Sequence, residues 1–128
     1  MAVTPRGETT TAQTLIVRNT ARGTELANQA AVARTSAARR IGLLRHSSLP
    51  RGSGLWIVPC EGIHTFGMKF PIDVVFLDRK LKVLKTVHNL KPWRISLCLA
   101  AYSVLELPAG TLKATATTRG DQLEFEEC

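Results

Sequence analysis

The stretch that decides the fold is "IDVVFLD", residues 72–78. Val74 and Phe76 share one face of an extended chain here, and Val75 and Leu77 share the other. β-Branched and aromatic residues favour strands, and a strand that is apolar on both faces is covered on both. We therefore expect residues 72–78 to form a central strand that is buried on both sides.

Segments with the same character recur along the chain. The four residues "DRKL" at 78–81 have the length of a hairpin connection, and residues 91–102, which contain "KPWR", are expected to be a loop. The remaining expected strands are 14–19 (TLIVRN), 24–33 (TELANQAAVA), 55–59 (LWIVP), 63–68 (IHTFGM), 82–90 (KVLKTVHNL), 103–108 (SVLELP) and 122–126 (QLEFE).

One helix is expected at residues 36–46, "SAARRIGLLRH". A hydroxyl from Thr35 or Ser36 can cap the free amides of its first turn. Apolar residues at spacings of four and three positions form one stripe along it. The members of this stripe are Ala37, Ile41 and Leu44. A single helical turn capped by Thr111 is the only other helical element that the pattern favours.

These elements predict a mainly β fold: a compact antiparallel β-sandwich or barrel with one short α-helix at about residues 36–46. The first twelve residues are rich in Thr, Gly and Pro, and we expect a flexible tail at 1–12 followed by a single β-rich domain at 13–128. No apolar run is long enough for a membrane span, and no secretory signal is recognisable, so the default expectation is a cytoplasmic protein.

The charge of +7 is unevenly distributed. Residues 34–51 and residues 79–94 contain arginines and lysines but no acids. Such segments can attract a small anionic ligand or an acidic protein surface, but solvated loops and helix faces that keep the protein in solution are the favoured explanation. Nucleic-acid binding is a weaker alternative, because the aromatic and Gly-rich signatures of nucleic-acid modules are missing from the sequence.

Cys60 and His64 are separated by three residues, a spacing that allows a thiolate–imidazole pair or half of a metal site. The alternative is a buried thiol at a strand end and a histidine hydrogen-bonded to the backbone. The chain has three cysteines and no CxxC pair, so reduced thiols are expected and a four-cysteine zinc site is not. Nucleotide motifs are also missing, and no cofactor is expected.

Five motifs follow one another in a fixed order along the chain: GLL (42–44), HTFGMKFPIDVVFLD (64–78), LKPWR (90–94), VLELPAG (104–110) and GD (120–121). Together they resemble the bacterial domain of unknown function 192 family over roughly residues 36–125. The resemblance implies a compact, mainly β fold of sandwich or barrel type and no established activity. Gly67 stands where many members have a tryptophan, and Phe70-Pro71 stand where they have Asn-Thr.

Two carboxylates interrupt apolar strands. Asp73 is expected to share a face with Val75, and a buried carboxylate must be paired or hydrogen-bonded. Asp73 is therefore either a general base or an acceptor for backbone amides, with Lys69 and His64 as its nearest charged partners in sequence. Glu106 is either an amide acceptor at a strand end or the second member of a carboxylate pair with Asp73.

Trp93 and Arg94 form an indole–guanidinium pair that is either a recognition element or a plug at one end of the fold. Together with His64, Lys69, Asp73 and Glu106 they are the candidate ligand-binding residues. The favoured function is a non-enzymatic ligand- or protein-binding domain with a groove near these strand ends. The alternative is a small enzyme or metal-binding protein that uses Cys60, His64, Asp73 and Glu106 together.

Overall fold

The computed structural model describes residues 13–43 and 46–128. The expected tail at 1–12 and two positions of the expected helix, 44–45, lie outside the described residues. The helices are α1 (Ser36–Ile41) and α2 (Thr111–Thr115). The strands are β1 (Thr14–Asn19), β2 (Thr24–Ala33), β3 (Ser53–Ile57), β4 (Gly62–His64), β5 (Ile72–Leu77), β6 (Val83–Leu90), β7 (Ile95–Leu97), β8 (Ser103–Pro108) and β9 (Leu123–Glu127).

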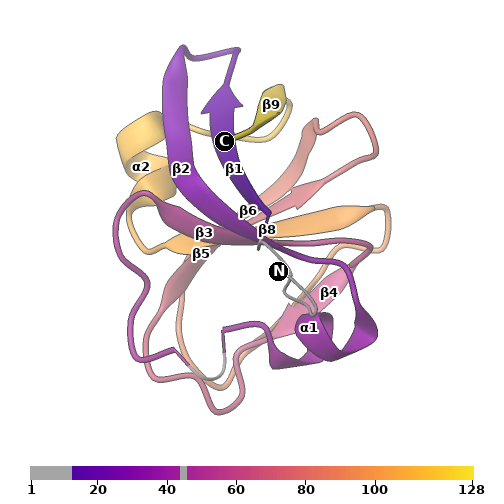
Figure 1. Ribbon diagram of the computed structural model, residues 1–128. Coiled ribbons are helices and arrows are strands. Elements are labelled where there is room, and N and C mark those ends of the chain that lie inside the picture. Colours follow the sequence, from indigo (N-terminus) through magenta and orange to yellow (C-terminus); the bar gives the residue numbers. More distant parts are fainter. Residues whose placement is uncertain (1–12, 44–45) are drawn as a thin grey trace.

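The expected mainly β fold is confirmed. Seven strands form one strongly curled sheet in the order β6-β5-β8-β3-β2-β1-β9, and β4 pairs with β7 in a second, small sheet (Figure 1). All neighbouring strands are antiparallel except β2 and β3, which run parallel, so the large sheet is mixed. The two edge strands approach each other at an isolated bridge between Lys82 and Gln122, which gives the sheet the shape of a half-barrel.

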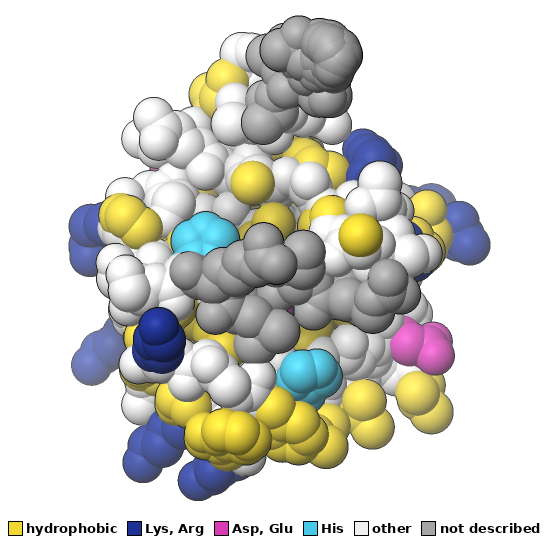
Figure 2. Space-filling model, turned by 60° about the horizontal axis from the view of Figure 1, so that its bottom comes forward, with side chains coloured by type: hydrophobic (Ala, Val, Ile, Leu, Met, Phe, Trp, Pro, Cys, Tyr) yellow, Lys and Arg dark blue, Asp and Glu magenta, His cyan; other side chains and the backbone are white. Residues whose placement is uncertain are grey.

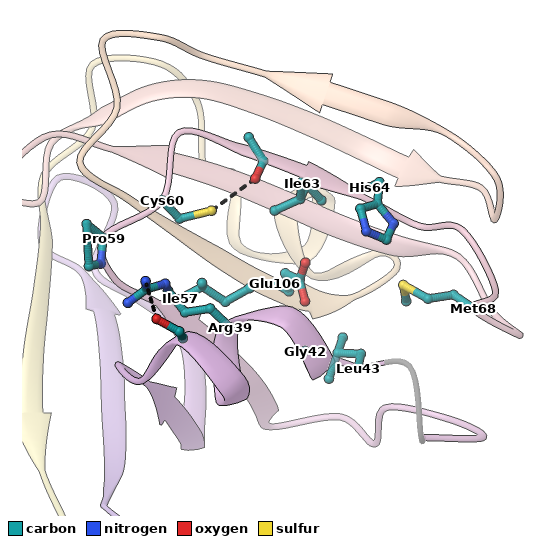
Figure 3. A pocket seen from close by; sticks show the side chains of 12 residues that line it. Arg39, Gly42, Leu43, Ile57, Pro59, Cys60, Ile63, His64, Met68 and Glu106 are labelled. Carbon is teal, nitrogen blue, oxygen red and sulfur yellow. Dashed lines mark hydrogen bonds between the residues drawn. The ribbon is translucent and has the colours of Figure 1, made fainter.

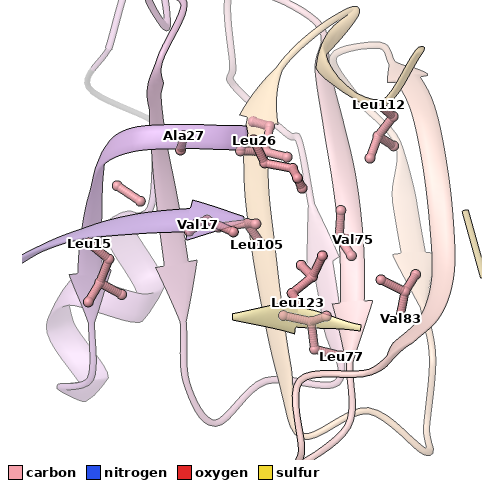
Figure 4. Close-up of a cluster of buried hydrophobic side chains, with 12 residues drawn as sticks. Leu15, Val17, Leu26, Ala27, Val75, Leu77, Val83, Leu105, Leu112 and Leu123 are labelled. Atoms are coloured by element: carbon pink, nitrogen blue, oxygen red, sulfur yellow. The ribbon is translucent and has the colours of Figure 1, made fainter. Parts of the chain in front are cut away.

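Strand β5 is buried along its whole length, as its sequence predicts. Val75 and Leu77 belong to the inner core of the curled sheet, where side chains from strands at both ends of the order meet (Figure 4). Val74 and Phe76 belong to an outer core on the opposite face. Ile63, from the small sheet, and residues near α1 complete that outer core. The large sheet is therefore covered on both faces, as expected for a strand that is apolar on both sides.

Helix α1 is shorter than predicted. Thr35 caps it, because its Oγ1 accepts a hydrogen bond from the amide of Ala38 at 3.0 Å. The helix ends at Ile41, and Gly42 adopts a positive φ of 48° that L-residues with side chains rarely adopt. The expected apolar stripe is also incorrect at its first position: Ala37 is exposed, whereas Ala38 packs against the outer core.

Two expectations for the small sheet were wrong. The predicted strand 63–68 ends at His64, because the chain turns at Thr65, whose hydroxyl donates to the carbonyl of Lys91 at 2.7 Å. Gly67 has a φ of 81°, so the turn is incompatible with a continuing strand. Residues 95–97, expected to be loop, form β7 and pair with β4.

The "GD" motif has a structural role. The carboxylate of Asp121 accepts hydrogen bonds from Asn19 Nδ2 and Arg22 Nε, each at 3.0 Å, and from the amide of Thr118 at 3.1 Å. These hydrogen bonds connect the turn after β1 with the turn before β9. Among the described residues, neither helix has the length or apolar character needed to cross a membrane.

Candidate ligand-binding cavity

A half-open cavity of about 480 Å³ lies on the outer face of the large sheet. Figure 3 shows it between α1 on one side and the chain of Cys60, Ile63 and His64 on the other, with Glu106 pointing into the space. Its walls combine apolar side chains such as Ile57 with a few polar groups. The cavity therefore offers both apolar and polar contacts to a molecule that enters it.

Glu106 forms the buried polar end of this cavity. It lies on β8 between Leu105 and Leu107, opposite Leu55 of β3 and Val74 of β5. The side chain is only 4% exposed, and among the described atoms its Oε1 has no hydrogen-bond partner. Burial raises the pKa of this carboxyl from its ordinary 4.5 to about 7. The expected role of Glu106 as an amide acceptor is therefore not what the structure shows.

Cys60 lines the same cavity. Its Sγ donates a hydrogen bond to the carbonyl of Gly62 at 3.0 Å, and its backbone amide donates to the carbonyl of Tyr102 at 2.8 Å. Burial is the largest cause of a raised pKa for this thiol. The thiol therefore stays protonated and is a poor nucleophile near neutral pH.

His64 lies at the exposed rim of the cavity, at the end of β4. Its Nδ1 accepts a hydrogen bond from the amide of Phe66 at 3.2 Å, so Nε2 carries the proton of the neutral ring. His64 and Cys60 therefore share a cavity, as their spacing allowed. Each is held by its own backbone contact, and among the hydrogen bonds of the described residues none joins the two side chains.

Arg39, which the sequence did not single out, also lines the cavity. Its guanidinium donates to the carbonyl of Arg34 at 2.6 Å and to Ser36 Oγ at 3.5 Å, which holds it beside the first turn of α1. The only signal in the sequence was its place away from the expected apolar stripe of the helix. A cation at this wall can contact an acceptor group of a bound molecule.

Asp73 does not contribute to the cavity. Its Oδ1 accepts the amide of Asn89 at 2.8 Å, and its Oδ2 accepts the amides of Gly110 at 3.1 Å and Leu112 at 2.9 Å. Asp73 thus takes the role of N-cap for α2, in which Thr111 was expected and Gly110 has no capping side chain. Of its two expected roles, accepting backbone amides is the one that the structure shows.

The remaining candidates lie on the outside of the small sheet. Lys69, Trp93 and Arg94 are exposed and do not line the cavity. The ring of Trp93 stacks on that of Phe66 with centroids 5.8 Å apart. Arg94 Nη1 donates to the carbonyls of Pro92 at 3.4 Å and Trp93 at 3.3 Å, so its guanidinium stays with its own loop.

The four residues of the enzyme or metal-site hypothesis are divided between two faces. Cys60, His64 and Glu106 line one cavity, whereas Asp73 points into the inner core with its oxygens already occupied. Within residues 13–43 and 46–128, no three side chains of His, Cys, Asp or Glu are arranged to hold a metal ion. What the arrangement provides is a buried carboxyl with a free acceptor, reached through a partly apolar opening.

A curled, mainly β half-barrel with a cavity between the large sheet, α1 and the small sheet defines a compact β-domain. The chain belongs to the DUF192 family, described as "Uncharacterized ACR", whose model matches residues 17–125. The resemblance inferred from the ordered motifs is thereby confirmed. A curated relative, the UPF0127 protein PH1112 of Pyrococcus horikoshii, is 36% identical over 93 residues, which are 68% of this chain and 78% of that protein.

Two solved structures share the fold. A protein of unknown function from Novosphingobium aromaticivorans has a TM-score of 0.75 at 21% identity, over 87% of this chain and 83% of its own. A Sinorhizobium meliloti protein described as "a putative transcription regulator" has a TM-score of 0.81 at 24% identity, over 93% of this chain and 98% of its own. At these identities, both likenesses establish the fold alone.

Proposed function

We propose that the protein is a small-ligand-binding domain and that its ligand presents a hydrogen-bond donor, best an ammonium group, to Glu106. The observation that carries this proposal is the free Oε1 of a side chain that is 4% exposed and points into a cavity. A buried acceptor without a partner costs stability. A bound donor removes this cost, and the relief contributes to the affinity.

Comparison with the other buried carboxylates supports the assignment. Asp73 accepts three amides, and Asp121 accepts three donors, so both are satisfied within the protein. Glu106 differs from them in having an acceptor left over for a molecule from outside. Three buried side-chain atoms of the described residues lack a hydrogen-bond partner: Trp56 Nε1, Ser103 Oγ and Glu106 Oε1. Of these, only Glu106 lines the cavity, and buried polar groups are nearly always paired, so its free oxygen marks the position where a bound molecule can supply the partner.

The size and chemistry of the cavity are consistent with a small organic molecule. Its volume of about 480 Å³ lies within the range of about 300–1,000 Å³ typical of ligand pockets. Apolar walls from Ile57 and Met68 suit a hydrocarbon body, and Arg39 can meet an acceptor or anionic group at the opening. An anionic group of a ligand would find its partner in Arg39, whereas Glu106 favours a donor.

A role in proton transfer is the second candidate, and the pKa of about 7 for Glu106 favours it, because general acids and bases work best near the operating pH. Binding is the simpler proposal, since it needs only the free carboxyl oxygen. Covalent catalysis by the neighbouring thiol is not favoured either, because burial raises the pKa of Cys60.

Nucleic-acid binding is not favoured by any described contact. The guanidinium groups of Arg34 and Arg79 lie over the rings of Trp56 and Tyr102, at 5.1 and 4.2 Å from the centroids. Both guanidinium groups thus stack on aromatic rings of the fold. The description of the Sinorhizobium meliloti protein as a transcription regulator keeps this alternative open to a simple test, the salt-dependent retention of the protein on DNA compared with heparin.

The proposal is tested by amide chemical-shift mapping, which detects even millimolar binding. The probes are cyclohexylamine and benzylamine, each compared with the carboxylate built on the same ring. At about pH 8 most Glu106 carboxyls are ionised, so the amines are expected to shift the amide signals of Ile57, Cys60 and Ile63. The carboxylates are expected to shift these signals less.

Two variants that each remove one carboxylate make the comparison specific. Glu106→Gln is expected to weaken amine binding at least about tenfold, because a charge-assisted hydrogen bond is lost. Asp78→Asn, in the turn after β5, is expected to bind the amines like the wild type. Amine shifts that are missing in the wild type, or that persist unchanged in Glu106→Gln, contradict the proposal.

A further inference from the structure

A second surface lies outside the cavity, on β7, where apolar side chains face the solvent and a polar side chain faces inward. On β7 the side chains of Ile95 and Leu97 point outward and are 61% and 55% exposed, while Ser96 between them is buried. A strand on the surface of a soluble domain normally shows the opposite alternation. The outward face of β7 therefore has the character of a surface that something else covers.

This apolar character continues on both sides of β7. Phe66, Trp93 and Leu99 are exposed by 41%, 65% and 76%. Trp93 stacks on Phe66, Phe66 lies 5.0 Å from the ring of His64, and His64 pairs with Ile95 across the small sheet. We call Phe66, Trp93, Ile95, Leu97 and Leu99 the β7 patch. They are all the large apolar side chains that are exposed in the described part of the chain.

Cations border the β7 patch. Lys85 Nζ donates to the carbonyl of Leu97 at 2.8 Å, and Arg94 lies between Trp93 and Ile95 in the chain. Lys69 and Lys91 are exposed beside the turn that holds Phe66. Figure 2 shows hydrophobic side chains gathered along one edge of this face, with lysine and arginine side chains to one side of them and an acidic side chain at the other.

We propose that the β7 patch docks the protein onto the surface of an anionic lipid membrane. Exposed aromatic and aliphatic side chains bordered by cations are the combination that places a peripheral protein at the headgroup level. The cationic border is complementary to anionic headgroups, and it opposes association with a second copy, since this chain has a net charge of +7. None of the five side chains lines the cavity, so docking does not depend on ligand binding.

The experiment is co-sedimentation of the full-length protein with vesicles of phosphatidylcholine alone or with about one third phosphatidylglycerol, an anionic lipid. Binding is expected to the anionic vesicles and to be at least about tenfold weaker on the neutral ones. The emission of Trp93 is expected to shift to shorter wavelength on the anionic vesicles, and Trp93→Phe should lose this shift while the protein still sediments.

Two pairs of substitutions locate the binding surface. Lys91→Glu with Arg94→Glu changes the charge beside the patch, and is expected to reduce binding about tenfold or more. Lys113→Glu with Arg119→Glu makes the same change in net charge, with Lys113 on α2, which lies on the other side of the molecule (Figure 1). This control is expected to reduce binding about threefold or less, because long-range attraction is screened by salt.

The apolar contribution is measured with Ile95→Ser combined with Leu97→Ser, which is expected to reduce binding at least about tenfold. If that pair lowers the thermal stability, Leu99→Ser serves instead, since Leu99 follows β7 and is the most exposed member of the patch. Absence of binding to anionic vesicles overturns the proposal and leaves a protein as the partner of the patch. The proposal is also overturned if the α2 control and the patch variants lose vesicle binding to the same extent. It is overturned as well if the wild-type protein is a dimer in solution that the serine substitutions dissociate.

Discussion

Asp73 on β5 and Glu106 on β8 lie on adjacent, hydrogen-bonded strands, but their carboxyl groups lie on opposite faces of the sheet. Asp73 pairs with Leu107, and Glu106 pairs with Val74, so the two acids are one position out of register. Side chains alternate between faces along a strand, so this offset separates them completely. One acid stabilises the inner layer of the fold, and the other belongs to the cavity on the outer face.

The first prediction concerns the structural acid. Asp73→Asn is expected to lower the free energy of unfolding by about 2 kcal/mol. The asparagine side chain has one acceptor oxygen, whereas the backbone N–H groups of Asn89, Gly110 and Leu112 use both oxygens of Asp73. Urea denaturation measures this change. The matched control is Asp78→Asn: both of its amide contacts use Oδ1 alone, so a change within about 0.5 kcal/mol is expected. Equal effects at the two positions would contradict the capping role of Asp73.

The second prediction is a pH dependence of stability caused by Glu106. Its pKa is raised from 4.5 to about 7 on folding, so the folded protein binds this proton more tightly than the unfolded chain. The contribution to stability is therefore present in full below about pH 4.5 and is lost as the pH rises to about 7. The difference of pKa corresponds to about 3 kcal/mol.

Glu106→Gln isolates this effect, because glutamine has nearly the same shape and does not titrate. The variant is expected to match the wild type at about pH 4.5 and to exceed it in stability by about 3 kcal/mol at about pH 8. Urea denaturation at a series of pH values yields the difference between the two proteins. A difference that stays constant over this range shows that the carboxyl titrates normally.

The third prediction concerns thiol reactivity. Cys60 is half-buried, its Sγ donates to Gly62, and its pKa is raised, whereas Cys128 is exposed. A variant that retains Cys60 alone is expected to react with Ellman's reagent at least about tenfold more slowly than one that retains Cys128 alone. Both variants should react at the same rate in denaturant. Equal rates in the folded proteins would mean that Cys60 is an activated thiol.

Much of the fold could be predicted from local sequence. The apolar residues on both faces of residues 72–77 predict a strand buried on both sides, and the structure confirms it in β5. Strand β7 was missed because it is three residues long and follows a Pro-Trp loop, which leaves too short an alternation to recognise. Helix α1 was predicted to be too long, because the apolar periodicity of the sequence continues past Gly42. The backbone conformation of Gly42 ends the helix there.

The different roles of Asp73 and Glu106 could not be predicted from the sequence. Asp73 and Glu106 each interrupt an apolar strand, so their local patterns are equivalent. The difference lies in amides that come from Asn89, Gly110 and Leu112, far along the chain from Asp73. Only the tertiary structure brings those donors to one carboxylate and leaves the other without any.

The central claim is that a ligand donor meets the carboxyl of Glu106, and the most direct measurement is the pH titration of its side-chain carbon signal by NMR. The free protein is expected to titrate with a pKa of about 7. In saturating cyclohexylamine the pKa is expected to fall by at least about one unit, because a nearby ammonium favours the ionised carboxyl. A free pKa close to 4.5, or one of about 7 that cyclohexylamine leaves unchanged, would contradict the account.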